Sequence, residues 1–191
     1  RKITAADGKI STIAGTGVAT FSGDGGLATS AGLSRPTNIA FDQSGNLYIL
    51  DSGNNRVRKV VLGTGVITTA AGLTGVDDPR GIGVNSSGVV YITDTHGSKA
   101  LKKIDGDGNF VTVIGGFNYP HDLAVDVSGN IYVANSSNSS IDKVASDGSS
   151  KATFLGGFND PRAIDIDSSR GYLYVAEHSN HRILKVNTNG A

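Results

Sequence analysis

Short runs of alternating apolar and polar residues follow one another along the whole chain, separated by turns rich in Gly, Asn, Asp and Ser. An alternating run of about four to eight residues predicts a half-buried β-strand, and no stretch keeps the 3.6-residue period of an amphipathic helix over about ten residues. Other runs, such as LYIL, VVYIT, IYVA and LYVA, are almost continuously apolar, which is typical of strands covered on both faces. The pattern predicts an all-β protein.

The same group of runs occurs four times. Each copy begins with a proline, and these prolines recur every 41–43 residues, at Pro36, Pro79, Pro120 and Pro161. A period of about 40–45 residues with several strand signals per copy is typical of the blades of a β-propeller. Because a single copy buries too little surface to fold alone, the copies are expected to pack face to face. We expect one propeller domain over residues 1–191, with blades near 36–72, 79–115, 120–156 and 161–191.

Each copy predicts a four-stranded antiparallel meander. An alternating strand after the proline leads through a tight Asx–Gly turn to the most apolar strand, and a third strand with basic residues precedes a fourth that ends at Gly. Between the two apolar residues of the first strand, three copies have a small residue, at Ala40, Gly83 and Ala124, which allows neighbouring backbones to approach closely. The fourth copy has Asp165 there, and we expect this carboxylate to be hydrogen-bonded.

The two ends of the chain carry complementary parts of a copy. Residues 1–15, RKITAADGKISTIAG, read as the end of a third strand, a turn and a fourth strand, whereas the last copy ends after its third strand at 183–186. If the blades close into a ring, KISTIAG is expected to pair with the 183–186 strand as complementary outer strands, which removes an exposed sheet edge. Three arrangements stay open: a closed ring of four blades, part of a larger propeller, and a subunit that neighbouring molecules complete.

Several stretches resemble a known repeat. PHDLAVDVSGNIYVANSSNSSIDKV and HSNHRILKV are similar to NHL repeats, and GTGVATFSGDGGLATSAGLSRPTNIAFD resembles the long entry loop of bacterial and secreted NHL arrays. The resemblance extends over essentially the whole chain and implies a β-propeller with the proline-led strand innermost. Some relatives are lyases with histidine ligands and a catalytic arginine, but those positions do not map onto this chain residue by residue, so the activity is not carried over. Other relatives bind RNA on a basic face, but basic residues are sparse on the corresponding face of this chain.

Composition narrows the range of partners. Seventeen basic and seventeen acidic residues give no net charge, which weighs against nucleic acid or an anionic membrane as partner. The chain has no cysteine, which excludes disulfides, thiol catalysis and cysteine-based zinc sites, and no apolar run approaches the ~20 residues of a membrane-spanning helix. Because the chain starts at Arg1 and lacks methionine, we expect a processed product or part of something longer. Its Ser-, Thr-, Asn- and Gly-rich surface predicts an extracellular or cell-surface protein.

Candidate ligand contacts follow the prolines that open each copy. These positions hold Thr37, Arg80, His121 and Arg162. Arginine suits bidentate contact with a carboxylate or a phosphate, and three of the four side chains are cationic or can become so. We add Tyr119 and His178, which the propeller topology places on the same face. In the alternative interpretation, each cation only pairs with a nearby carboxylate and stabilises its own loop. The carboxylates in question are Asp78, Asp122 and Asp160.

Other polar residues are expected to have structural roles. The strand ends carry Asp51, Asp94, Asn135 and Glu177. Side chains of this kind most often fix turns. The four histidines come from three copies, so we expect no metal site, and no cofactor is expected either. The segment SGDGG at 22–26 lacks the ligand series of a nucleotide or calcium loop and reads as a flexible connector.

These observations favour a non-catalytic binding or scaffold propeller that acts outside the cell through its loops. The expected partner is a protein, a second molecule of the same chain, or a small anionic ligand. Two alternatives stay open. The chain is a structural subunit of an extracellular assembly or fibre joined through edge strands, or it is a lyase or hydrolase with a site in the propeller channel.

Overall fold

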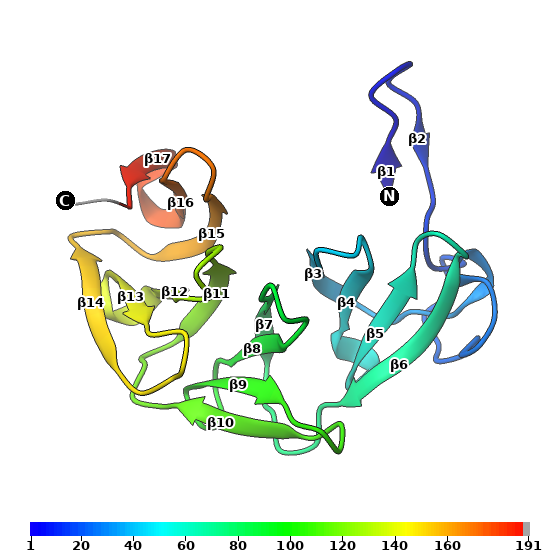
Figure 1. The fold of residues 1–191 in the computed structure, drawn as a ribbon, viewed down its shortest axis with the longest axis horizontal. Helices are drawn as coiled ribbons and strands as arrows, with labels where there is room; N and C mark the ends of the chain where they lie inside the picture. The colour runs from blue at the N-terminus through cyan, green and yellow to red at the C-terminus, as the bar shows by residue number, and fades with distance from the viewer. Residues whose placement is uncertain (189–191) are drawn as a thin grey trace. The chain divides into compact units, whose positions relative to one another are not determined.

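The computed structural model describes residues 1–188, in which every element longer than three residues is a β-strand (Figure 1). Within this part of the chain the helical segments are short 3-10 turns of three residues each, and no helix is long and apolar enough to cross a membrane. The prediction of an all-β protein is confirmed. The chain divides into two compact units, residues 1–74 and a second unit that begins at Gly75.

The first unit contains one complete blade and a short hairpin. The blade is an antiparallel sheet of β3 (Pro36–Phe41), β4 (Leu47–Asp51), β5 (Arg56–Val61) and β6 (Val66–Gly72), in that order. The hairpin pairs β1 (Lys2–Ile3) with β2 (Ile10–Ser11). Ile3 and Ile10 are 67% and 62% exposed, so the hairpin adds little to the core of this unit.

Residues 12–35, called here the entry segment, pack against one face of this blade. Ala28 and Ala31 are buried in a cluster with Leu47, Ile49 and residues of the outer strands. Ile13 and Leu33 pack against the same cluster. The entry segment therefore covers an apolar sheet face, and it includes the 3-10 turn Ala28–Ser30.

A buried arginine fixes the entry segment to the blade. The Arg58 side chain is fully buried, and its Nη2 lies 2.7 Å from Asp24 Oδ1, with Thr69 Oγ1 donating to the other oxygen of Asp24 at 2.6 Å. Arg58 also donates to the backbone carbonyls of Gly32 and Ser22. The flexible-connector interpretation of SGDGG at 22–26 is therefore wrong, because Asp24 anchors this segment to the sheet.

The second unit contains three sheets that follow one another in chain order (Figure 1). The first sheet contains β7 (Pro79–Val84), β8 (Val90–Asp94), β9 (Ala100–Ile104) and β10 (Phe110–Ile114). The second contains β11 (Pro120–Val125), β12 (Ile131–Asn135), β13 (Ser140–Val144) and β14 (Lys151–Gly156). The third contains β15 (Pro161–Asp167), β16 (Tyr172–Glu177) and β17 (Arg182–Asn187). Every pairing is antiparallel between consecutive strands, which confirms the predicted meander of propeller blades.

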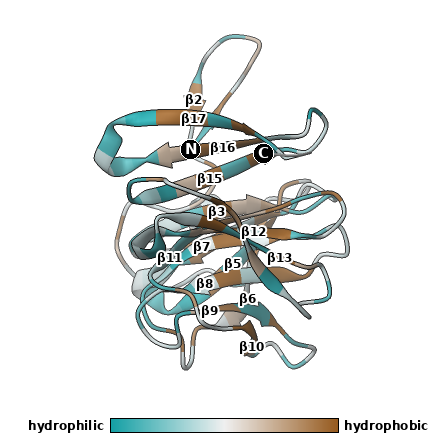
Figure 2. Cartoon of the chain, turned by 90° about the vertical axis from the view of Figure 1, so that its left-hand side faces the viewer, coloured by the Kyte–Doolittle hydropathy of each residue, from teal (hydrophilic) through white to brown (hydrophobic). Residues whose placement is uncertain are grey.

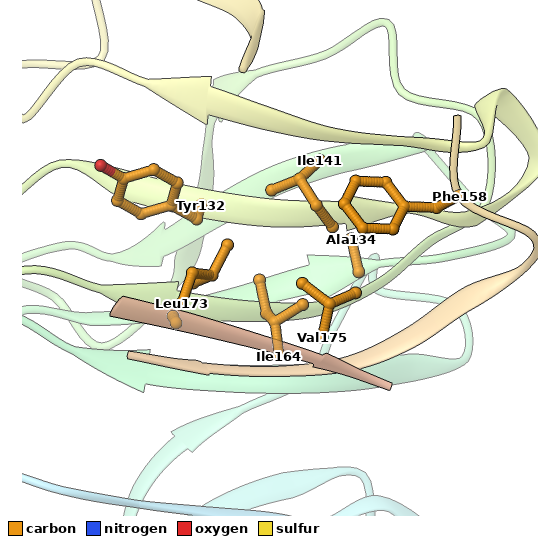
Figure 3. Packing of buried hydrophobic residues seen from close by; sticks show 8 residues of the cluster. Tyr132, Ala134, Ile141, Phe158, Ile164, Leu173 and Val175 are labelled. Carbon is orange, nitrogen blue, oxygen red and sulfur yellow. The ribbon is translucent and has the colours of Figure 1, made fainter. Parts of the chain in front are cut away.

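The sheets of the second unit pack face to face through their first strands, with β11 in contact with both β7 and β15. Between the second and third sheets, Tyr132 and Ile141 on one side meet Ile164, Leu173 and Val175 on the other (Figure 3). All five side chains are at least nine-tenths buried. In Figure 2 apolar residues concentrate on the strands, while the connecting loops are mostly hydrophilic.

The turn between the first two strands follows the predicted Asx–Gly pattern. In the second sheet, Asp126 accepts hydrogen bonds from both the backbone N–H and the side-chain amide of Asn130, each at 2.8 Å. Gly129 has φ +84°, in the left-handed region that glycine adopts without strain. The Asp side chain and the glycine together reverse the chain within four residues of Asp126.

Small residues on the first strands allow close approach, as predicted. A Cβ at Gly83 would lie 2.4 Å from Leu123 Cδ1 of the next sheet, and Ala124 is buried in the cluster of the following interface. Asp165, at the equivalent position of the last sheet, is exposed and accepts a hydrogen bond from the backbone N–H of Ile166 at 2.8 Å. The expectation that this carboxylate is hydrogen-bonded is confirmed.

Candidate functional site

Each proline that opens a blade is preceded by a residue in the left-handed backbone region. These residues are Arg35, Asp78, Tyr119 and Asp160, with φ between 46° and 61°. A non-glycine residue rarely adopts positive φ, and the ring of the following proline disfavours helical backbone further. Such a conformation costs about 1–3 kcal/mol and persists only where the surroundings hold it. The same strained turn therefore occurs at the entry to all four blades.

The strand-end polar residues hold these entry turns. Asp94 Oδ1 accepts a hydrogen bond from the Asp77 backbone N–H at 3.0 Å, and Asn135 Oδ1 accepts one from the Asn118 N–H at 2.7 Å. In the other two blades, Asp51 accepts a hydrogen bond from the Ser34 backbone N–H, and Glu177 accepts one from the Asn159 backbone N–H. The prediction that these side chains fix turns is confirmed, and each of them reaches back to the loop before its own blade.

Asp94 is the most densely bonded of the four. Its buried carboxylate accepts hydrogen bonds from the Ser98 backbone and hydroxyl at 3.0 and 2.6 Å, and Lys102 Nζ lies 3.2 Å away. Burial alone would raise the pKa of Asp94, but the hydrogen bonds from Ser98 and Asp77 and the contact with Lys102 outweigh it and lower the pKa. The folded chain therefore holds Asp94 in its ionised form.

Acidification is expected to destabilise the second unit through Asp94. Its folded-state pKa lies below the unfolded-state value of about 3.9. The stabilisation is therefore complete above the unfolded-state pKa and is lost as the pH falls through the lower, folded-state pKa. Urea denaturation between pH 6 and pH 2.5 checks this against Asp94→Asn, which copies the Asn135 arrangement without a titrating group and should show a shallower loss below about pH 4. An identical pH dependence in both proteins would contradict the assignment.

Three of the predicted site residues meet at the entry turns of the second unit. Arg80 Nη1 lies 3.2 Å from His121 Nε2. The Tyr119 ring centre lies 6.3 Å from that of His121 and 5.8 Å from the Arg80 guanidinium carbon. Arg80 belongs to β7, whereas Tyr119 and His121 flank Pro120 at the start of β11, so residues about 40 positions apart in sequence share one site.

Arg80 and Arg162 each pair with the carboxylate of the strained turn residue two positions earlier in the chain. Asp78 Oδ2 contacts Arg80 Nε at 2.7 Å and His96 Nδ1 at 2.9 Å. The His96 ring in turn stacks edge-on against Tyr119, with 4.9 Å between ring centres. The sequence places His96 on this face without predicting it as a ligand contact, and its pairing with Asp78 joins it to the site.

The next blade repeats the arrangement. Asp160 Oδ2 contacts Arg162 Nε and Nη2 at 2.9 and 2.8 Å, and His178 Nδ1 at 3.1 Å. Hydrogen bonding with Arg162 is the largest influence on Asp160 and lowers the pKa of this carboxyl against the opposing effect of burial. The ion pairs that the alternative interpretation expects are thus present for Asp78 and Asp160. Asp122 instead accepts a hydrogen bond from the backbone N–H of Ile164.

His121 joins the two arrangements. Its pKa is lowered, first by burial of the ring and then by the positive charges of Arg80 and Arg162. A hydrogen bond with the Arg162 backbone and the charge of Asp160 oppose this shift without cancelling it. His121 is therefore a neutral imidazole at pH 7 that contacts the Arg80 guanidinium and the Arg162 backbone.

We call this set the entry-turn cluster. It consists of Asp78, Arg80, His96, Tyr119, His121, Asp160, Arg162 and His178. Thr37, the remaining predicted contact, belongs to the first unit, where its hydroxyl hydrogen-bonds Ser52 Oγ at 2.7 Å. Within residues 1–188, no group of three or more His, Asp or Glu side chains is arranged to hold a metal ion.

An open hollow of about 400 Å³ adjoins the Arg162 end of the cluster. Its lining comprises Arg162, Ala176, Glu177, His178, His181, Arg182 and Ile183. The sequence places Arg182 on the same face, but it is not among the predicted ligand contacts. The Arg182 side chain forms an ion pair with the buried Glu177 that anchors the entry turn. The sequence signal for Arg182 is its position directly after the turn that follows β16. The same turn contains His181, whose φ is +54°.

The NHL repeat family matches the chain at residues 33–60 and 117–143. These segments include the first three strands of the first-unit blade and of the second sheet in the second unit. The repeats predicted by resemblance are therefore present at two positions. No curated protein sequence matches the chain.

Solved structures share the fold at low sequence identity. A nidogen/laminin complex structure matches with TM-score 0.71 and 17% identity over 85% of this chain and 62% of that one. Virginiamycin B lyase from Staphylococcus aureus matches with TM-score 0.64 and 16% identity over 80% and 52%. A protein of unknown function from Bacteroides thetaiotaomicron matches with TM-score 0.66 and 22% identity over 78% and 46%. The chain spans about half to three-fifths of the length of these proteins, and the likeness shows a β-propeller fold.

Proposed function

We propose that these NHL repeats form a non-catalytic binding propeller whose entry-turn cluster recognises a carboxylate or phosphate group on its ligand. An NHL-type propeller supports a binding or scaffold role in general. The observation that carries the finer proposal is that Arg80 Nη1 lies 3.2 Å from His121 Nε2, while His121 also hydrogen-bonds the backbone of Arg162, whose positive charge acts on the same ring. Two guanidinium groups at neighbouring blade entrances suit an anion that bridges them.

The arginines are both accessible and preorganised. The side chains of Arg80 and Arg162 are 34% and 42% exposed, and those of their partners Asp78 and Asp160 are 35% and 27% exposed. Each aspartate contacts the Nε edge of its guanidinium, so the side chain is ordered before a ligand arrives. A side chain that is already ordered loses less conformational entropy on binding. Tyr119 and His96 add an aromatic wall beside Arg80 for the ligand body.

Replacing Arg162 with glutamine is expected to weaken binding of inorganic phosphate and citrate by about tenfold or more, because a hydrogen bond to a charged group contributes about 1.5–3 kcal/mol. Titration followed by amide chemical shifts measures both affinity and location. The matched control is Arg170→Gln, since Arg170 is 74% exposed and pairs with Asp167 in a β15–β16 turn.

The wild-type shifts should centre on residues 78–80, 119–121 and 160–162, and the Arg170→Gln protein should behave as wild type. Binding of sulfate, which keeps its charge over this range, should strengthen as the pH falls below the usual range of histidine, because protonation of His121 adds a positive charge to the site. Phosphate and citrate shifts that are absent, or equal in the Arg162→Gln and Arg170→Gln proteins, would refute the proposal.

The proposal places this binding at the cell surface or outside the cell. The absence of cysteine and the abundance of small polar residues support that location. The nidogen/laminin complex offers a parallel in which a protein of this fold was crystallised with a partner. Fractionation of the source cells, with the chain recovered in the cytoplasm, would overturn this part.

A lyase is the second candidate function, supported by the fold shared with virginiamycin B lyase and by the histidines of the entry-turn cluster. In that case His121, already neutral at pH 7, would act as the base. An assay of virginiamycin B turnover tests it. Turnover that disappears in His121→Ala while the circular dichroism spectrum is retained would favour the lyase, and no turnover by the wild type would remove it.

A further inference from the structure

The first strands of the second unit have an irregular register directly after their prolines. In β7 two residues, Arg80 and Gly81, lie opposite the single residue Thr93 of β8. In β11 His121 and Asp122 share one place in the same way. A β-bulge of this kind changes the direction of a side chain and is frequent next to functional sites. The direction of the side chain after the proline therefore depends on what holds the bulge.

A single buried hydroxyl joins the bulges of β7 and β11. Thr93, which is 0% exposed, accepts a hydrogen bond from the Gly81 backbone N–H at 2.8 Å and donates one to the His121 backbone carbonyl at 3.3 Å. Because Gly81 directly follows Arg80, the hydroxyl connects the backbone beside one member of the entry-turn cluster to the backbone of another. The side-chain contact between Arg80 Nη1 and His121 Nε2, at 3.2 Å, joins the same two strands.

The architecture of a blade does not require a hydroxyl at this position. Thr93 lies two residues after the tyrosine that the four copies share, and the equivalent positions of the other three blades hold Leu50, Ala134 and Ala176. Leu50 and Ala134 are as fully buried as Thr93, so an apolar side chain fits this position in a packed blade. The buried hydroxyl of Thr93 therefore needs an explanation other than the packing of the blade.

A second buried hydroxyl in the same blade belongs to the repeat instead. Thr95 Oγ1 donates to the Pro120 carbonyl at 2.7 Å, and in the next blade Ser136 Oγ donates to the Pro161 carbonyl. This contact recurs whichever residue follows the proline. The Thr93 contact has no such counterpart, because the equivalent positions of the other described blades hold apolar residues.

We propose that Thr93 is a positioning residue of the entry-turn cluster, whose hydroxyl holds Arg80 and His121 in the relative position that an anion requires. This role rests on the proposed function, in which the anion binds at these two residues and at Arg162. Without the hydroxyl, the Gly81 N–H and the His121 carbonyl lose their shared partner, and the two bulges can adopt other arrangements. The apparent affinity then falls with the fraction of molecules in the competent arrangement.

The variants Thr93→Ala and Thr93→Ser test this role. Alanine occupies the equivalent position of two other blades, so Thr93→Ala should fold, which circular dichroism verifies, and serine keeps the hydroxyl. NMR titration of the His121 ring reports on its surroundings, because burial and the charges of Arg80 and Arg162 lower its pKa. We expect the pKa of His121 to rise toward the usual value of about 6.5 in Thr93→Ala and to return to the wild-type value in Thr93→Ser.

Sulfate binding gives the second readout. The affinity for sulfate, followed by amide chemical shifts, should fall by about two- to tenfold in Thr93→Ala, the range that the net contribution of one hydrogen bond supports. It should recover in Thr93→Ser. The control is Ser149→Ala, which removes a hydroxyl hydrogen bond to Asp147 in the exposed turn between β13 and β14 and should leave both readouts unchanged.

A purely structural role for Thr93 predicts a different result. Thr93→Ala would then lower the midpoint of thermal unfolding while the folded protein kept the wild-type pKa of His121 and the wild-type sulfate affinity, and this outcome would overturn the proposal. Failure of Thr93→Ser to restore either readout would also contradict it. The His121 titration needs no ligand, so a wild-type protein that binds neither sulfate nor phosphate would refute the proposed function, while the pKa comparison would still decide the role of Thr93.

Discussion

Replacement of Arg58 with methionine is expected to lower the free energy of unfolding of the first unit by about 3–5 kcal/mol, the usual cost of removing one partner of a buried ion pair. Arg58 is fully buried and its Nη1 lies 3.6 Å from Asp51 Oδ2, which is also fully buried. Methionine has a similar length, so the change removes the charge and the hydrogen bonds with little change in volume.

The loss extends beyond a single pair. Arg58 also binds Asp24 and the carbonyls of Ser22 and Gly32, and its guanidinium lies 4.9 Å from the Phe21 ring centre. Without it, the entry segment loses three polar contacts and one cation–π contact to the sheet, and Asp51 loses its ion-pair partner but keeps the hydrogen bonds from Ser34 and Asn54. We expect the entry segment to detach first and to expose the apolar face of β4 and β5.

Denaturation of the full chain by urea, with proteolysis of the entry segment as a second readout, checks this prediction. The matched control is Arg170→Met, because exposed ion pairs contribute about 0–1 kcal/mol. Wild-type stability and wild-type resistance to cleavage within residues 12–35 of the Arg58→Met protein would show that the entry segment does not depend on Arg58.

Gly81→Ala is the second substitution with a large expected effect, a loss of about 1–3 kcal/mol from overpacking. An alanine Cβ at this position would lie 2.8 Å from the Asp122 Cα and 2.9 Å from the Leu123 backbone N. The obstacle is backbone of the adjacent strand β11, so the two sheets must separate to accommodate a single methyl group. The positions of Arg80 and His121 depend on this contact, and anion binding should weaken together with stability.

The control for this change is Gly115→Ala, because a Cβ at Gly115 meets no atom within 4 Å and its φ is not positive. Thermal unfolding of the two variants separates close packing from the general effect of losing a glycine. A Gly81→Ala protein as stable as Gly115→Ala would mean that β7 and β11 can move apart without cost.

The sheets could be predicted because their signals are local. The alternation after each proline, the Asp126–Gly129 type of turn and the 41–43 residue period all depend on residues close in sequence. The ion pairs of Arg80 with Asp78 and of Arg162 with Asp160 could also be predicted, as an alternative to ligand binding, because the two residues of each pair are only two positions apart. Such contacts are set by the turn that contains both residues.

The less predictable parts depend on contacts between distant residues. Arg58 stands in a run of basic residues, RVRKV, that predicts only a third strand, and its partner Asp24 lies 34 positions earlier among glycines. His96 likewise finds Asp78 and Tyr119 in turns that belong to different blades. No periodicity in one sequence shows which of several polar side chains will meet across sheets.

In the turns with positive φ before the four prolines, the residues that fix the backbone differ from the residue that is placed to contact a ligand. A buried carboxylate or amide at the end of the second strand binds a backbone N–H of each turn. The side chain after the proline does not make this backbone contact, although Arg80 and Arg162 pair with the side chains of the turn residues Asp78 and Asp160. The residue after the proline is threonine, arginine, histidine and arginine in successive blades, while the backbone conformation of the turn stays the same. Single substitutions at this position can therefore change ligand specificity. A library randomised at these four positions would sample new ligands with little effect on folding.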